Sequence, residues 1–273
     1  MATSAQEAFL KAFHANHPAA TSEAFGDGRT PDNRSSYQVL ASRVAGAGRV
    51  LDLGCGDGAL LELLAATGRE LTGIDISPDS LALARRRPAL AEARLLEGRA
   101  QELPFADNSF DACVSHMALM LMGEIERVAT EIARVLVPGG TLACAVGGGA
   151  AGGEGYQVFL DLLRPLVESA PAEHRIPPMG DRRTRTREGL DEILGPAGFG
   201  PATWETVVVD LSAPVERVWS SVSCLYDVPP LGVETVASLR ERFVAEAAAI
   251  TRPDGTVPCG LRVHVATASA APS

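Results

Sequence analysis

The sequence predicts an α/β fold: a seven-stranded, mostly parallel sheet with helices on both faces and a helical cap. From residue 48 onward, short apolar strands alternate with amphipathic helices, which is typical of a parallel sheet covered on both sides. The 273 residues are 46% apolar, enough for one sizeable core. Two later segments, 147–186 and 213–231, interrupt the alternation but are too apolar for plain loops. We expect them to cover the carboxyl ends of the strands, where open α/β sheets bind ligands.

The elements follow from the spacing of apolar residues. Two helices, over 4–18 and 35–46, are expected before the first strand, because apolar residues recur there at helical spacing. Strands are then predicted at 49–53, 71–75, 93–97, 110–115 and 141–146. Helices are predicted between them at 57–67, 78–87 and 122–136. The last of these helices is expected to end at the "VPGG" turn, residues 137–140.

The second part of the chain begins with the run "GGGAAGGEG", residues 147–155, in which six of nine residues are glycine. Such a run favours a flexible link. Later helices are predicted at 156–168, 186–200 and 233–249, and strands at 202–212 and 261–268. The predicted organisation has N-terminal helices that contribute to the cap (1–47), a ligand-binding core (48–146), a cap insertion (147–186) and the rest of the core (187–273).

Composition excludes several classes of partner. A net charge of −10 argues against nucleic acid or an anionic membrane, because both require a basic surface. The five cysteines are scattered and form no CxxC pair, so neither a metal site nor a disulfide framework is indicated. The sequence shows no signal-peptide pattern and no apolar stretch of 18 residues. We expect a cytoplasmic protein.

The stretch "LDLGCGDGA", residues 51–59, brings backbone close to a ligand, and three interpretations compete for it. A phosphate-binding P-loop requires a lysine that is absent here. A dinucleotide fingerprint fits Gly54, Gly56 and Ala59 only weakly. The third interpretation includes Asp52, two residues before the first glycine. Its carboxylate would repel a pyrophosphate but suits a cofactor that carries an ammonium group.

A second acid supports a nucleoside ligand. Asp75 ends the second predicted strand, 19 residues after Gly56, and this placement suits an acceptor for two ribose hydroxyls. The alternative is that Asp75 caps the helix that starts near Pro78, but Ser77 suits that role better.

Four motifs together resemble the class I S-adenosylmethionine-dependent methyltransferases that act on small molecules: "VLDLGCGDG" (50–58), "LTGIDIS" (71–77), "LPFADNSFDACVSHM" (103–117) and "EIARVLVPGGTLA" (131–143). The resemblance covers residues 48–146. It implies a Rossmann-like fold, S-adenosyl-L-methionine as cofactor and S-adenosyl-L-homocysteine as product.

The resemblance also implies which residues form the cofactor site: Tyr37, Asp52, Gly54, Cys55, Gly56, Asp75, Ile76, Ala100, Gln101 and Ser115. The glycine turn would hold the methionine part and Asp75 the ribose, with adenine against Ile76. Many family members carry an acid where this chain has Arg99. An arginine accepts no hydrogen bond from the adenine amino group, so that contact must come from Gln101 or from backbone.

The candidates for the acceptor side are weaker. His116, at the end of a strand near the expected methyl group, is the candidate catalytic base, and the alternative is a residue that lines the cofactor. The candidate substrate residues, equally consistent with the core of the cap, are Tyr156, His174, Trp219 and Tyr226. Four arginines in "DRRTRTR" (181–187) suit either a solvated loop or a clamp for an anionic group. His14 and His17 could face the pocket, but solvent exposure is the favoured interpretation, and His264 is expected to be structural.

These observations predict methyl transfer to O, N or C of a small, largely apolar metabolite, in secondary metabolism. One alternative is a non-methylating enzyme of the same fold, such as a cyclase that binds the cofactor. A second is a cofactor-binding interaction module. An NAD-dependent reductase would leave Asp52 unexplained. The oligomeric state is open, a homodimer included.

Overall fold

The computed structural model describes residues 4–66, 68–152 and 154–272. Its centre is a seven-stranded open sheet with the order β3-β2-β1-β4-β5-β7-β6. The strands are β1 (Arg49–Leu53), β2 (Glu70–Asp75), β3 (Arg94–Glu97), β4 (Phe110–His116), β5 (Leu136–Ala150), β6 (Thr203–Asp210) and β7 (Gly260–Ser269). The five neighbouring strands β3, β2, β1, β4 and β5 pair in parallel, whereas β7 is antiparallel to both β5 and β6. The predicted fold class is confirmed.

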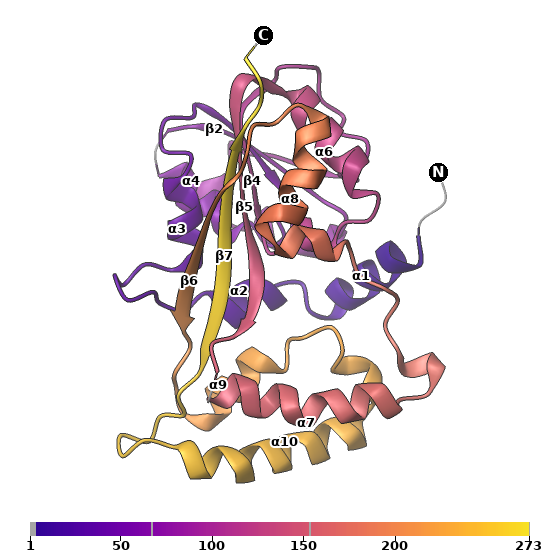
Figure 1. The fold of residues 1–273 in the computed structure, drawn as a ribbon, viewed down its shortest axis with the longest axis vertical. Helices are drawn as coiled ribbons and strands as arrows, with labels where there is room; N and C mark the ends of the chain where they lie inside the picture. The colour runs from indigo at the N-terminus through magenta and orange to yellow at the C-terminus, as the bar shows by residue number, and fades with distance from the viewer. Residues whose placement is uncertain (1–3, 67, 153, 273) are drawn as a thin grey trace.

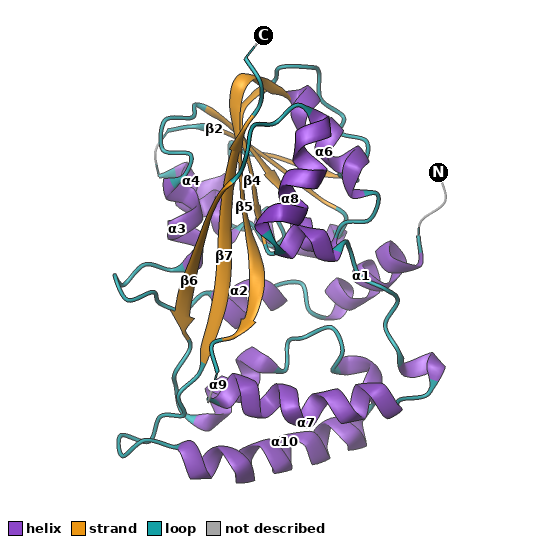
Figure 2. Ribbon diagram, viewed as in Figure 1, coloured by secondary structure: helices purple, strands orange, loops and turns teal. Residues whose placement is uncertain are grey.

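Helices cover both faces of the sheet (Figure 2). The α-helices are α1 (Ala5–Asn16), α2 (Ala20–Phe25), α3 (Ser36–Ser42), α4 (Ala59–Ala65), α5 (Pro78–Ala84), α6 (Ile125–Val135), α7 (Gly155–Ser169), α8 (Arg187–Leu194), α9 (Val215–Val222) and α10 (Val233–Ala247). Alternate residues of a strand point to opposite faces. In β1, Val50 therefore packs in the core beside α3 and α4, whereas Leu51 packs in the core beside α6 and α8.

The cap has a core of its own. Helices α7, α9 and α10 pack around Phe159, Val218 and Phe243, each with 0% of its surface exposed. Figure 1 shows these helices as a layer beyond one end of the sheet, with α1 and α2 between that layer and the strands. The cap layer therefore faces the carboxyl ends of β1, β2 and β4.

Local signals start several helices. Ser4 and Glu7 form a reciprocal capping box at the start of α1, and Ser35 and Gln38 do the same for α3. Ser77 caps α5, as the sequence predicts, because its hydroxyl accepts a hydrogen bond from the amide of Ser80. Among the described residues, the helices lack the combination of length and apolar character needed to cross a membrane.

The largest departure from the predicted elements is β5. It continues through 147–150 instead of ending at 146, so the prediction of a flexible link from residue 147 was wrong there. Gly147 pairs with Val263 of β7, and a Cβ on Gly148 would lie 2.6 Å from the His264 ring. Gly148 therefore has no room for a side chain, whereas a Cβ on Gly147 would meet its nearest atom at 3.6 Å. The "VPGG" residues 137–140, predicted as a turn, belong to the start of β5. Helix α2 was not predicted. Thr67 and Gly153, within predicted segments, lie outside the described residues.

Candidate active site

Three adjoining cavities lie at the carboxyl ends of the central strands β1, β2 and β4. The Ile76 cavity, about 90 Å³, lies against the end of β2 and the loop after β3. The Asp52 cavity, about 70 Å³, lies over the glycine turn 54–58, and the Tyr156 cavity, about 260 Å³, lies between it and the cap. The Ile76 and Asp52 cavities share His14, Gly54, Asp75, Ala118 and Leu121. The Asp52 and Tyr156 cavities share Thr21, Met117, Leu121 and Tyr226.

The glycine turn brings backbone to the cavities because no side chain fits there. Gly54 has a φ of +75°, and a Cβ on it would lie 2.4 Å from the Cβ of Ala118. Its amide donates to the carbonyl oxygen of Ile74 at 2.8 Å, which fixes the turn against β2. A substitution at Gly54 would therefore be strained and would also meet the opposite wall.

Asp75 is a carboxylate held in place by backbone. Its Oδ2 accepts from the amide of Gly56 and its Oδ1 from the amide of Ser77, each at 2.8 Å. Burial raises the pKa of Asp75, and the two amides act in the opposite direction. Each oxygen keeps a lone pair for another donor. Asp75 lines both the Ile76 and the Asp52 cavity, so it suits a pair of ribose hydroxyls between them.

Asp52 is a buried acid that lacks a partner. It is 1% exposed, and within the described part of the chain neither oxygen has a hydrogen-bond partner. Burial, and then the charges of Asp75 and Asp57, raise its pKa well above the usual range. A buried carboxylate is favourable only beside a positive group or donors. The site therefore fits a ligand with an ammonium group.

His116 and Tyr37 also line the Asp52 cavity. Their rings stack with centroids 3.8 Å apart. His116 Nε2 lies 2.9 Å from the hydroxyl of Ser36, and its Nδ1 is buried without a partner among the described residues. Burial lowers the pKa of His116 to about 3, so the imidazole is neutral at physiological pH.

The Tyr156 cavity is mostly apolar. Its walls come from α2, the end of β5, α7 and the α9–α10 connection. Its two ionisable groups besides tyrosines and Cys224 are Arg185 and Asp227. Burial lowers the pKa of Arg185 and raises that of Asp227. This chamber suits an apolar molecule with one or two polar groups.

Comparison with known proteins identifies this arrangement. The methyltransferase domain family matches residues 51–144. A demethylmenaquinone methyltransferase from Thermus thermophilus is 33% identical over 162 residues, which cover 55% of this chain and 74% of that protein. The chain belongs to the class I S-adenosylmethionine-dependent methyltransferases.

Two further similarities are narrower. A fatty-acid O-methyltransferase from Mycolicibacterium smegmatis is 40% identical over 114 residues, 40% of this chain, and this match spans only 42% of that protein. The solved structure of the [4+2]-cyclase SpnF covers 100% of this chain and 98% of its own, with a TM-score of 0.60 and 21% identity. At that identity the likeness shows the fold alone.

In this methyltransferase most predicted cofactor residues lie together. Six line the Ile76 or Asp52 cavity in addition to Asp52, Asp75 and Tyr37: Gly54, Cys55, Gly56, Ile76, Ala100 and Gln101. The candidate base His116 lines the Asp52 cavity as well. Ser115 lies elsewhere, because its hydroxyl donates to the carbonyl of Leu53 at 2.8 Å and accepts from the amide of Leu119. It joins β1 to the turn after β4.

The predicted substrate residues divide. Tyr156 and Tyr226 line the Tyr156 cavity. Trp219 packs against Phe159 and Phe243 in the cap core, with ring centroids 5.9 and 5.8 Å apart. His174 is exposed and lines none of the three cavities.

The arginine segment also divides. Arg183 forms ion pairs with Asp181 and Glu126. Arg185 instead lines the Tyr156 cavity, where its Nη1 donates to the carbonyl of Gly147 at 3.3 Å. Among the described residues no carboxylate pairs with it. Arg185 is therefore the arginine of this segment that can meet an acceptor.

Sequence reasoning missed the inner face of α1. Gln6, Glu7, Leu10 and His14 line the Ile76 cavity. Of the two interpretations of His14, exposure was wrong: the side chain is half-buried and lines the Ile76 and Asp52 cavities, and its Nε2 lies 3.2 Å from the hydroxyl of Tyr226. The signal was present as the helical spacing of positions 7, 10 and 14, but nothing local shows which ligand that face covers.

Proposed function

We propose that the protein transfers a methyl group to an oxygen of a small, largely apolar metabolite held in the Tyr156 cavity. The observation that carries this proposal is that this cavity adjoins the Asp52 cavity, with which it shares the lining residues Thr21, Met117, Leu121 and Tyr226. A nucleophile in the larger chamber can thus reach a methyl group presented from the smaller one. Arg185, the cation in the chamber, favours an acceptor with an acidic hydroxyl or a carboxylate.

The roles of the cofactor residues follow from their partners. Asp75 accepts from the ribose hydroxyls, Asp52 balances the ammonium group, and Gly54 lets the chain approach the methionine part. When bound, the cofactor supplies a methyl group on a positively charged sulfur, which is already an activated leaving group. The protein's contribution is to align the acceptor at roughly 3 Å and to exclude water.

His116 is the proposed proton acceptor for a hydroxyl substrate, through its Nδ1. Its burial keeps the imidazole neutral, but a pKa of about 3 also makes it a weak base. General bases are most effective when their pKa lies near the working pH. We therefore expect alignment to contribute more to the rate than His116 does.

The test is a turnover assay with isotopically labelled S-adenosylmethionine and a panel of long-chain carboxylic acids, phenols, quinols and amines. Mass spectrometry of both products is expected to show a labelled methyl ester or ether together with S-adenosylhomocysteine. Conversion of an acceptor without S-adenosylhomocysteine would instead indicate a cyclase-type reaction. Tight cofactor binding without any turnover would favour an interaction module.

A further inference from the structure

Two loops and α1 line the Ile76 cavity together with the end of β2. Gly98, Ala100 and Gln101 follow β3, and Gly123 precedes α6. Arg99 lies in the same loop but does not line this cavity. Besides Asp75, the acid that lines it is Glu7, in the first turn of α1.

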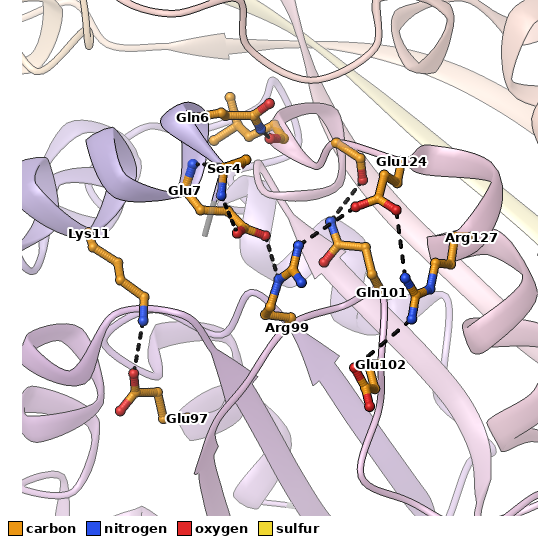
Figure 3. Close-up of polar contacts among 12 residues, drawn as sticks. Ser4, Gln6, Glu7, Lys11, Glu97, Arg99, Gln101, Glu102, Glu124 and Arg127 are labelled. Atoms are coloured by element: carbon orange, nitrogen blue, oxygen red, sulfur yellow. Dashed lines mark hydrogen bonds and ion pairs between the residues drawn. The ribbon is translucent and has the colours of Figure 1, made fainter. Parts of the chain in front are cut away.

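Glu7 is fixed from two sides. Its Oε2 accepts from the amide of Ser4 at 3.2 Å in the capping box. Its Oε1 accepts from Arg99 Nε at 2.7 Å. Figure 3 shows Arg99 between Glu7 and Glu124, so the guanidinium extends toward α1. The Glu7 side chain is 10% exposed, and a carboxylate so enclosed keeps one orientation.

The two neighbouring side-chain amides are anchored through their nitrogen atoms, and Glu7 differs from them in carrying a charged acceptor. Gln101 Nε2 donates to the carbonyl of Gly123 at 2.8 Å, and Gln6 Nε2 donates to the carbonyl of Leu121. The acids that line the Ile76 cavity are Asp75 and Glu7, and Asp75 is engaged by the amides of Gly56 and Ser77. Each oxygen of Glu7 has one partner among the described residues and can accept a second hydrogen bond.

We propose that Glu7 accepts a hydrogen bond from the exocyclic amino group of the cofactor's adenine, and that Arg99 positions Glu7 for this contact. The N-terminal helix thereby supplies the adenine-specific group that the loop after β3 lacks in this chain. Arg99 acts through Glu7 and does not itself contact the base. The proposal depends on S-adenosylmethionine as cofactor and is independent of the acceptor.

Binding measurements test this directly. Isothermal titration calorimetry would compare S-adenosylhomocysteine with its 6-deamino analogue, in which hydrogen replaces the amino group. Wild-type protein is expected to prefer S-adenosylhomocysteine about 10- to 100-fold, the range for a hydrogen bond to a charged acceptor. Glu7→Leu is expected to bind both ligands with affinities within about threefold, and Glu7→Gln to keep an intermediate preference, because an amide oxygen still accepts.

Two further variants separate this contact from loosening of α1. Lys11→Met breaks the other ion pair of this helix, Lys11 Nζ to Glu97 Oε1 at 3.1 Å, and neither residue lines the Ile76 cavity. It is expected to keep the wild-type preference. Arg99→Met leaves Glu7 less constrained and is expected to lower the preference by about threefold to tenfold.

The outcomes are distinguishable. A Glu7→Leu variant that discriminates as well as the wild type would overturn the assignment of Glu7. An unchanged preference in Arg99→Met would overturn the positioning role alone. A wild-type protein that binds both ligands equally would remove the basis for any amino-group contact. Failure to bind S-adenosylhomocysteine would overturn the cofactor assignment as well.

Discussion

The cofactor side and the acceptor side of the site are built in different ways. On the proposed cofactor side the acids Asp52 and Asp75 lie at strand ends, and Asp75 is held by the backbone amides of Gly56 and Ser77. On the acceptor side, helices of the cap form an apolar chamber in which Arg185 and Asp227 lack ion-pair partners among the described residues. Acids in fixed positions suit a single cofactor. The side chains that line the apolar chamber, in contrast, can be exchanged without disturbing the sheet. Substitutions should therefore affect either cofactor affinity or acceptor affinity.

The largest effect is expected on the cofactor side, from Asp75→Ala. Loss of two hydrogen bonds to a charged acceptor should weaken S-adenosylhomocysteine binding by about 2–4 kcal/mol. Calorimetry measures this change. Glu70→Ala, at the exposed start of the same strand, is the matched control and should bind as the wild type does. Equal affinities in both variants would contradict the role of Asp75.

Asp52→Asn should weaken S-adenosylhomocysteine binding by roughly 2 kcal/mol, because the ammonium group loses a charged partner. The free protein should behave in the opposite way and become more stable. A carboxyl with a raised pKa in the folded state stabilises that state fully at acidic pH and progressively less as the pH rises through the folded pKa.

Thermal unfolding at pH 5 and pH 8 checks this second part. At pH 8 the ligand-free wild-type protein should unfold at a lower temperature than Asp52→Asn. At pH 5 the difference between the two unfolding temperatures should be smaller. The pKa of Asp75 is also raised, but Asp75 is present in both proteins, so its effect on the pH dependence of stability largely cancels in the comparison. A gap that widens toward acid would show that Asp52 is not a destabilising buried charge.

Arg185→Met tests the acceptor side. It should raise KM for an anionic acceptor about tenfold, as expected for one lost charge-assisted contact, and leave S-adenosylhomocysteine affinity unchanged. Arg182→Met is the control, because Arg182 belongs to the same short helix (Arg182–Arg185) but does not line the Tyr156 cavity. A loss of cofactor affinity in Arg185→Met would break the separation between the two sides.

The smallest effect is expected from His116→Gln. Since burial lowers the pKa of His116 to about 3, turnover should show no inflection from this residue between pH 5 and 8. The substitution should lower kcat by less than about tenfold. Steady-state rates across that range measure both quantities. An inflection near pH 6.5 that disappears in the variant would establish His116 as a base that titrates in the active protein.

The region from β1 to β4 was predictable because its signals are local. β1 has the predicted bounds, and Asp75 and Ser77 lie as their positions after a strand and before a helix indicate. A strand, a glycine turn and a helix cap each depend on a few neighbouring residues. The Asp75–Gly56 contact joins two such units through the parallel pairing of β1 and β2.

Other features depended on partners that lie far away in the chain. The extension of β5 follows from its pairing with β7, more than 100 residues later. The sequence of "DRRTRTR" does not distinguish Arg183 from Arg185, and only packing turns one toward Glu126 and the other toward the Tyr156 cavity. Trp219 and Tyr226 are both cap aromatics, yet one packs in the cap core and the other lines the site.

The sequence by itself determined the class of fold, the glycine turn and the two acids Asp52 and Asp75, because each is encoded within a few neighbouring residues. Only the tertiary structure decided that α1 lines the Ile76 cavity and that Arg99 pairs with Glu7 on this helix. The physical reason is that a helix has several faces of similar composition. Which face meets a ligand is set by long-range packing, and local sequence carries no record of that contact.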